Sequence, residues 1–144
     1  MEVPFQRDLS KCGLIRLELI IDDNPYFFML DTGATTNFIT PEAAWRLGDR
    51  VRAVGIGRTS GYGKRLSRKE QIVAISFDFN DERLVLEFNI TGPKQFHLLD
   101  KSGFHLDGIL GSTFLYRSKA VIDYADLVIR FDKDREQKDL EEID

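Results

Sequence analysis

Apolar and polar residues alternate along several stretches of this chain. Residues 14–21, 71–79 and 84–90 carry apolar side chains at every second position, a period that is typical of half-buried β-strands. Shorter apolar runs at 26–30 and 109–111 predict strands that are buried on both faces. The pattern therefore predicts a chain built mainly from β-strands.

Two short helices are expected between the strands. Thr40 can cap a helix that begins at Pro41 and ends at Gly48, because a hydroxyl accepts from the free amides of a helix start and glycine suits the residue after a helix. Residues 112–117 are predicted to form the second helix. Three further strands are predicted at residues 50–56, 119–123 and 127–131, the last two as a hairpin.

Composition and charge limit the class of protein. The length of 144 residues suits a single domain, and 42% hydrophobic residues suffice for a packed core. The net charge of −4 argues against a nucleic-acid partner, which would require a broad basic surface. Residues 1–131 are expected to form the domain, and residues 132–144 a charged tail that is frayed or disordered.

The location of the protein is predicted from features that the sequence lacks. No apolar run approaches the ~20 residues that cross a bilayer, and residues 1–12 contain no apolar core of a signal peptide. Cys12 is the single cysteine, so no intrachain disulfide can form. We therefore expect a cytoplasmic protein without a membrane partner. An exported form with a trimmed signal peptide is the alternative.

The most unusual stretch is the one in which the apolar run 26–30 leads directly into Asp31, Thr32 and Gly33. Aspartate is rarely buried unless it is paired or hydrogen-bonded, and glycine lets another segment approach closely. The simplest interpretation is a turn that faces solvent. The alternative is that a rigid strand end presents the carboxylate to a site that another group completes.

A glycine-rich segment, residues 54–63, lies further along the chain. It predicts a flexible hairpin tip, which is either a mobile loop or a flap that closes over a bound ligand. The basic run at residues 58–69 is likewise either a solvated hairpin or a positively charged lid that favours acidic substrates.

Together these segments resemble the retropepsin-like aspartic proteases. The apolar run ending in residues 31–34, the glycine-rich segment, and residues 108–111 followed by 112–115 occur in the family's order. The resemblance implies a single-lobed, closed-barrel-like, all-β fold with one or two short helices. Thr35-Thr36 and Ser112 stand where viral members often carry acidic residues and an arginine, which indicates a cellular or bacterial member.

The resemblance also implies the activity of an aspartic endopeptidase. Asp31 from each of two subunits would form a carboxylate dyad that activates water, so a homodimer is expected. The substrate would be a peptide or protein, and neither a metal nor a cofactor is expected. Asp107 stands before the second apolar step rather than after it, so no second catalytic carboxylate is expected within one chain.

The resemblance assigns roles to the other residues of the site. Thr32 would form a hydrogen-bond lock across the two-fold axis, and Gly33 would hydrogen-bond the substrate backbone. The residues expected to contact substrate are Ala34, Thr35, Gly57, Gly61 and Tyr62, and those expected to support the site are Ile109, Leu110 and Gly111. His97 and His105 have no neighbour at metal-ligand spacing and are expected in surface loops.

Two other classes of function remain open. The chain is alternatively a catalytically silent dimeric scaffold with the same fold, or a peptide-binding module that uses the groove without turnover. The intact Asp31-Thr32-Gly33 triplet favours the enzyme, because a scaffold has no reason to keep two carboxylates in apposition.

Overall fold

The computed structural model describes residues 2–4, 15–59, 68–79, 82–91, 101, 103 and 105–131. Its strands are β1 (Glu2–Pro4), β2 (Ile15–Ile21), β3 (Asn24–Leu30), β4 (Asn37–Ile39), β5 (Val51–Thr59), β6 (Arg68–Phe79), β7 (Glu82–Ile90), β8 (Gly108–Leu110), β9 (Ala120–Asp123) and β10 (Val128–Phe131). Its helices are α2 (Pro41–Leu47) and α4 (Ser112–Arg117), and a 3-10 turn, η1 (Gly48–Arg50), follows α2.

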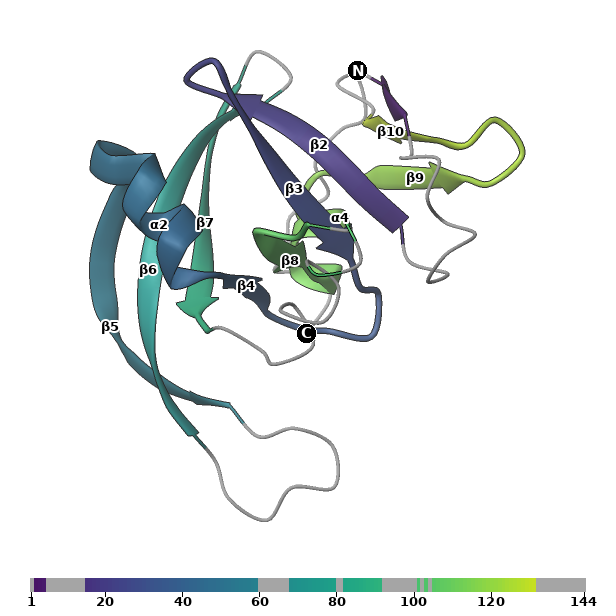
Figure 1. Cartoon of the computed structure of the whole chain (residues 1–144). Coiled ribbons are helices and arrows are strands. Elements are labelled where there is room, and N and C mark those ends of the chain that lie inside the picture. The colour runs from purple at the N-terminus through teal and green to yellow at the C-terminus, as the bar shows by residue number, and fades with distance from the viewer. Residues whose placement is uncertain are drawn as a thin grey trace.

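The strands form two sheets (Figure 1). The larger sheet has the order β2-β3-β8-β4-β7-β6-β5, and the smaller has the order β1-β10-β9. The predicted all-β class with short helices is thus confirmed. Among the described strands, β2 and β5 stand at the two ends of the larger order, so its hydrogen bonding does not close into a barrel.

The centre of the larger sheet mixes parallel and antiparallel pairs. β8 runs parallel to β3 and antiparallel to β4, and β4 runs parallel to β7. A strand from late in the chain is therefore inserted between two strands from its beginning. This insertion brings the predicted apolar runs 26–30 and 109–111 side by side, with Leu30 opposite Leu110.

The β2–β3 hairpin is closed by Asp22 and Asp23, whose φ angles of 50° and 64° are both positive. Positive φ at both central residues is the geometry of a type I′ turn, whose twist matches two-residue hairpins. Because Ile21 pairs with Asn24, the turn consists of Asp22 and Asp23 alone.

Helix α2 has the predicted start and end. Oγ1 of Thr40 accepts a hydrogen bond from the amide of Ala43 at 3.2 Å, and Pro41 is the first helical residue. Gly48 has a φ of 56° directly after the last residue. The hydroxyl satisfies one free amide, and glycine permits the left-handed exit, so local chemistry sets the length of this helix.

An aromatic cluster occupies the middle of the core. The ring centroids of Phe28, Phe77 and Phe88 lie 5.8–6.5 Å apart, a range in which aromatic pairs attract beyond their buried area. Val73 and Ile75 on β6 are also buried. The alternating apolar positions Val73, Ile75 and Phe77 all face the core, as the sequence pattern predicts, but Ala74 between them is buried as well, so burial on β6 does not strictly alternate.

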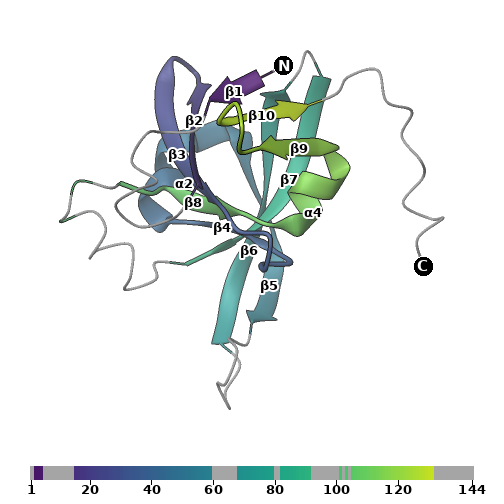
Figure 2. The same cartoon turned by 90° about the vertical axis from the view of Figure 1, so that its right-hand side faces the viewer.

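The smaller sheet is held by Arg130 on β10. Its guanidinium donates to Glu2 at 2.8 Å, to Asp126 at 2.8 Å and to Asp123. The hydrogen bond from Arg130, with amides of the β9–β10 turn, lowers the pKa of the Asp123 carboxyl. Figure 2 shows β1 beside β10, and β9 next to α4. The sequence pattern does not predict β1, since three residues are too few to show a period.

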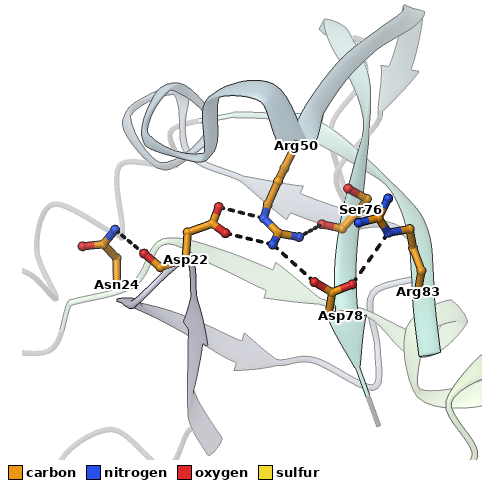
Figure 3. A network of polar contacts seen from close by, with 6 residues as sticks. All are labelled: Asp22, Asn24, Arg50, Ser76, Asp78 and Arg83. Carbon is orange, nitrogen blue, oxygen red and sulfur yellow. Dashed lines mark hydrogen bonds and ion pairs between the residues drawn. The ribbon is translucent and has the colours of Figure 1, made fainter. Parts of the chain in front are cut away.

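A second arginine, Arg50, ties the β2–β3 turn to β6 (Figure 3). Nε and Nη2 of Arg50 donate to Asp22 at 2.8 and 2.9 Å, and Nη1 donates to the Ser76 carbonyl at 3.0 Å. Nη2 also lies 3.3 Å from Asp78. Because Arg50 donates to its side chain, the pKa of the Asp22 carboxyl is lowered.

We predict that Arg50→Gln lowers the melting temperature by a few degrees at neutral pH. A carboxyl with a lowered pKa contributes stability that is complete above its usual range and is lost as the pH falls through the lowered value. The deficit of the variant should therefore narrow in thermal melts near pH 2. Arg83→Gln is the control, because its side chain is 69% exposed and lies 3.6 Å from Asp78. An equal deficit at both pH values would contradict the role given to Asp22.

Candidate active site

Asp31 follows the point at which two buried parallel strands end. The amide of Asp31 donates to the carbonyl of Leu110 at 3.0 Å, which extends the β3–β8 pairing by one hydrogen bond. Leu30 and Leu110 are buried on the core side, whereas the Asp31 side chain is half-buried. The carboxylate is therefore attached to a rigid strand end and remains accessible.

The turn after Asp31 holds the carboxylate through its own backbone. The amide of Gly33 donates to Oδ1 of Asp31 at 2.9 Å, and the amide of Ala34 donates to the Asp31 carbonyl at 3.1 Å. A Cβ at position 33 would lie 3.3 Å from Oδ1 of Asp31, so a side chain there would crowd the acid. Thr32 and Gly33 are exposed beside it.

The start of α4 fixes the far side of this turn. The amide of Ser112 donates to the carbonyl of Ala34 at 2.7 Å, and Oγ1 of Thr113 donates to the carbonyl of Thr35 at 2.6 Å. A Cβ at Gly111 would lie 2.6 Å from the Ala34 carbonyl oxygen. Leu110 and Gly111 therefore lie directly against the turn that residues 109–111 were expected to support, whereas Ile109 pairs with Met29 and Phe38.

Asn37 is a residue of this region that the sequence analysis did not single out. It is buried, with 3% of its surface exposed. Its Oδ1 accepts from the amide of Gly111 at 2.8 Å, and its Nδ2 donates to the carbonyl of Glu87 at 3.2 Å. Asparagine is uncommon in strands, so its occurrence beside the apolar pair 38–39 was the one feature of the sequence that could have indicated a supporting role for Asn37.

Asp107 is a buried carboxylate, but it lies at the opposite end of β8 from Asp31. Its Oδ2 accepts from the amide of Phe27 at 2.8 Å, and its Oδ1 lies 2.9 Å from Nε2 of His105 and 3.7 Å from Arg46. Phe27 and Asp31 are separated along β3 by four residues, or roughly 13 Å of extended chain. His105 is partly exposed, as expected of a surface loop residue.

The expected flap residues are only partly described. Gly57 was predicted at the hairpin tip, but β5 continues to Thr59 and Gly57 pairs with Glu70, so it lies within the strand. This part of β5 leaves no space for a side chain at position 57, since a Cβ there would lie 2.4 Å from Cδ1 of Ile72. Gly61 and Tyr62 lie outside the described residues.

Within the described ranges, no group of three histidine, cysteine, aspartate or glutamate side chains could hold a metal ion. None of the helices in those ranges combines the length and apolar character required to span a bilayer.

The comparison with known families decides the classification. Residues 17–114 match the family described as Aspartyl protease, and this range contains both the Asp31 turn and the β8–α4 support. The chain belongs to the aspartyl protease family. No curated protein matches the chain in sequence.

Solved structures of a retropepsin-like protease and of a retroviral protease-like domain have a similar fold. A retropepsin-like aspartic protease from Rickettsia conorii is 20% identical, with a TM-score of 0.55, and the similarity covers 90% of this chain and 88% of that one. The retroviral protease-like domain of Ddi1 from Leishmania major is 16% identical, with a TM-score of 0.54, covering 83% of this chain and 89% of that one. The predicted retropepsin-like fold of this aspartyl protease family member is thus confirmed.

We predict that Gly111→Ala destabilises the protein by about 1–3 kcal/mol, because the new methyl group would meet the carbonyl oxygens of Ala34 and Thr36 at 2.6 and 2.7 Å. Urea unfolding measures the change. Gly55→Ala is the matched control, since no atom lies within 4 Å of a Cβ there, and it should change stability by less than about 1 kcal/mol. Equal effects of the two substitutions would show that the close approach at Gly111 is unimportant.

Proposed function

We propose that the protein is an aspartic endopeptidase whose active form is a homodimer with Asp31 of each subunit at a shared site. The observation that carries the proposal is the placement of Asp31. A family match alone gives the residue type, whereas the structure gives a half-buried carboxylate on a strand end pinned to β8. Exposed Thr32 and Gly33 flank it, leaving room for a partner and a substrate.

Two copies are proposed because one chain supplies one suitable acid. Hydrolysis of a peptide bond by carboxylates requires one group that takes a proton from water and one that donates a proton to the carbonyl. Asp107 is the one buried carboxylate of the described residues. Its oxygens are engaged by Phe27 and His105 at the far end of β8, so it does not reach Asp31. A second copy related by two-fold symmetry supplies the missing acid.

The proposed mechanism follows from two carboxylates that share one proton. The ionised Asp31 removes a proton from water, while protonated Asp31 of the partner subunit polarises the scissile carbonyl. Thr32 is proposed to hydrogen-bond across the axis and Gly33 to bind the substrate backbone. The proposed substrate contacts continue through Ala34, Thr35, Gly57, Gly61 and Tyr62.

The domain is proposed to extend beyond the matched range to residue 131. β9 and β10 follow α4 directly, and the ring of Phe131 lies 6.0 Å from that of Phe114. Ile129 is fully buried in the same core. Residues 132–144 are proposed to be a charged tail outside this domain. A cytoplasmic location stays a prediction.

We predict that Asp31→Asn reduces peptide hydrolysis by at least about 10²-fold, since loss of a general base typically costs ~10²–10⁴-fold. The amide has nearly the same shape but cannot accept the proton. A peptide-library digest with and without pepstatin measures the activity, and sedimentation equilibrium measures the dimer. Asp49→Asn is the control, because Asp49 is exposed on η1, and it should retain full activity.

Three results would contradict the proposal. Residual turnover of Asp31→Asn above about one hundredth of the wild-type rate would remove Asp31 from the chemistry. A wild-type protein that is active as a monomer would remove the shared dyad. A stable dimer that cleaves no member of the library would favour the silent scaffold.

A further inference from the structure

A groove of about 470 Å³ opens beside the turn that follows Asp31. Its walls come from the segment after that turn, from β5, β6 and β7, and from α4. Figure 1 shows β5, β6 and β7 next to one another, with α4 set apart from them. Two arginines, Arg52 on β5 and Arg117 on α4, line it. We call this feature the arginine groove.

Arg52 and Arg117 differ in their ion pairing from the arginines that stabilise this fold. Arg46, Arg50 and Arg130 each lie within ion-pair distance of at least one aspartate. Neither Arg52 nor Arg117 makes an ion pair with any residue in the described part of the chain, and both are exposed. The groove is therefore a locally basic site on a chain whose net charge is −4, and such a site attracts anionic groups.

Part of the lining between the arginines is apolar. Val54 and Val85 are 49% and 46% exposed, and Ile72, which pairs with Gly55 and Asn89, is a half-buried residue of the lining. Glu87 is the one acidic residue of the lining. An occupant that suits both features is an extended segment with apolar side chains against the apolar part of the lining and carboxylates near the arginines.

The groove is continuous with the Asp31 turn. Thr35 lines the groove and is four residues from Asp31. The end of the groove at Thr35 therefore lies within about 14 Å of Asp31 along the chain. An extended peptide advances ~3.3 Å per residue. A peptide with its scissile bond at Asp31 therefore reaches the groove about three to four residues from that bond.

We propose that the arginine groove binds an acidic stretch of the peptide substrate, and that Arg52 and Arg117 determine this specificity. The proposal rests on the proposed endopeptidase function. The substrate class is a peptide that carries glutamate or aspartate, next to apolar residues, about three to four positions from the cleaved bond. Glu87 disfavours further negative charge at the β7 side, so the two arginines set where the carboxylates bind.

The first test is a peptide-library digest that reads the residues at each position around the cleaved bond. The wild-type protein should favour acidic over amide side chains at the distal position by about two- to thirtyfold, the range expected from two exposed ion pairs. The preference should weaken at high salt. Arg52→Gln/Arg117→Gln should abolish it, and Arg83→Gln, which removes one charge elsewhere, should retain it. Cleavage without an acidic preference, or a preference unchanged in the double variant, would overturn the groove proposal while leaving the protease intact.

The second test does not depend on turnover. Fluorescence anisotropy would measure binding of Asp31→Asn protein to a labelled decapeptide of alternating glutamate and valine, and to its glutamine counterpart. The acidic peptide should bind several-fold more tightly, and the added Arg52→Gln/Arg117→Gln change should remove the difference. If the wild-type protein cleaves no peptide but its affinities for the two peptides still differ in a way that depends on the arginines, the endopeptidase function is overturned. The role of the groove as a substrate subsite is then overturned as well.

The third test separates the substrate from the chain's own tail. Residues 132–144 contain seven acidic and three basic residues, so they share the chemistry of the proposed occupant. In the full chain, Glu141→Gln/Glu142→Gln/Asp144→Asn should leave the cleavage rate of acidic peptides unchanged. A rate increase in this variant that disappears when Arg52 and Arg117 are also replaced would identify the tail as the occupant and overturn the substrate assignment.

Discussion

The close approach of the backbone at residues 108–111 is the constraint on which the rest of this structure depends. β8 lies between β3 and β4, and there is no space for a side chain at either end of it. A Cβ at Gly108 would lie 2.4 Å from the Phe38 carbonyl oxygen, and one at Gly111 would lie 2.6 Å from that of Ala34. Glycine at both positions allows three segments distant in sequence to meet within hydrogen-bond distance.

A buried polar side chain anchors each end of this central strand. Asn37 accepts from the amide of Gly111 at the end nearest Asp31, and Asp107 accepts from the amide of Phe27 at the other end. Buried amides are costly to leave without partners, so both side chains specify how the segments meet. This arrangement fixes the position of the Asp31 carboxylate, because the backbone amide of Asp31 donates to the carbonyl of Leu110 between the two anchoring side chains. The proposed chemistry therefore depends on residues that do not touch a substrate.

The arginines of the described residues include two kinds, those that join segments through ion pairs and those without an ion-pair partner in that part of the chain. Arg50 and Arg130 each join segments that local structure leaves separate, the first linking a hairpin turn to β6 and the second linking β1 to the β9–β10 hairpin. Their aspartate partners account for part of the acidic character of the chain. Arg52 and Arg117 have no such partner in the described residues, and they face the groove beside the Asp31 turn. Charge on this protein thus stabilises its hairpins, and at the groove it supplies the two arginines that are proposed to bind an acidic peptide.

The sequence by itself determined the features that depend on short-range chemistry. Alternation predicted β2, β6 and β7, the capping residues predicted the start and end of α2, and the apolar run before Asp31 predicted a carboxylate at a strand end. Tertiary structure alone decided the features that depend on contacts between distant segments. β1 is a strand because β10 pairs with it, and Gly57 is in a strand because β6 extends to pair with β5. Asn37 is a structural anchor because Gly111, 74 residues later, is its partner. Arg52 and Arg117 line one groove for the same reason: the fold places β5 and α4 on its walls, and the local sequence does not indicate which distant segments share a surface.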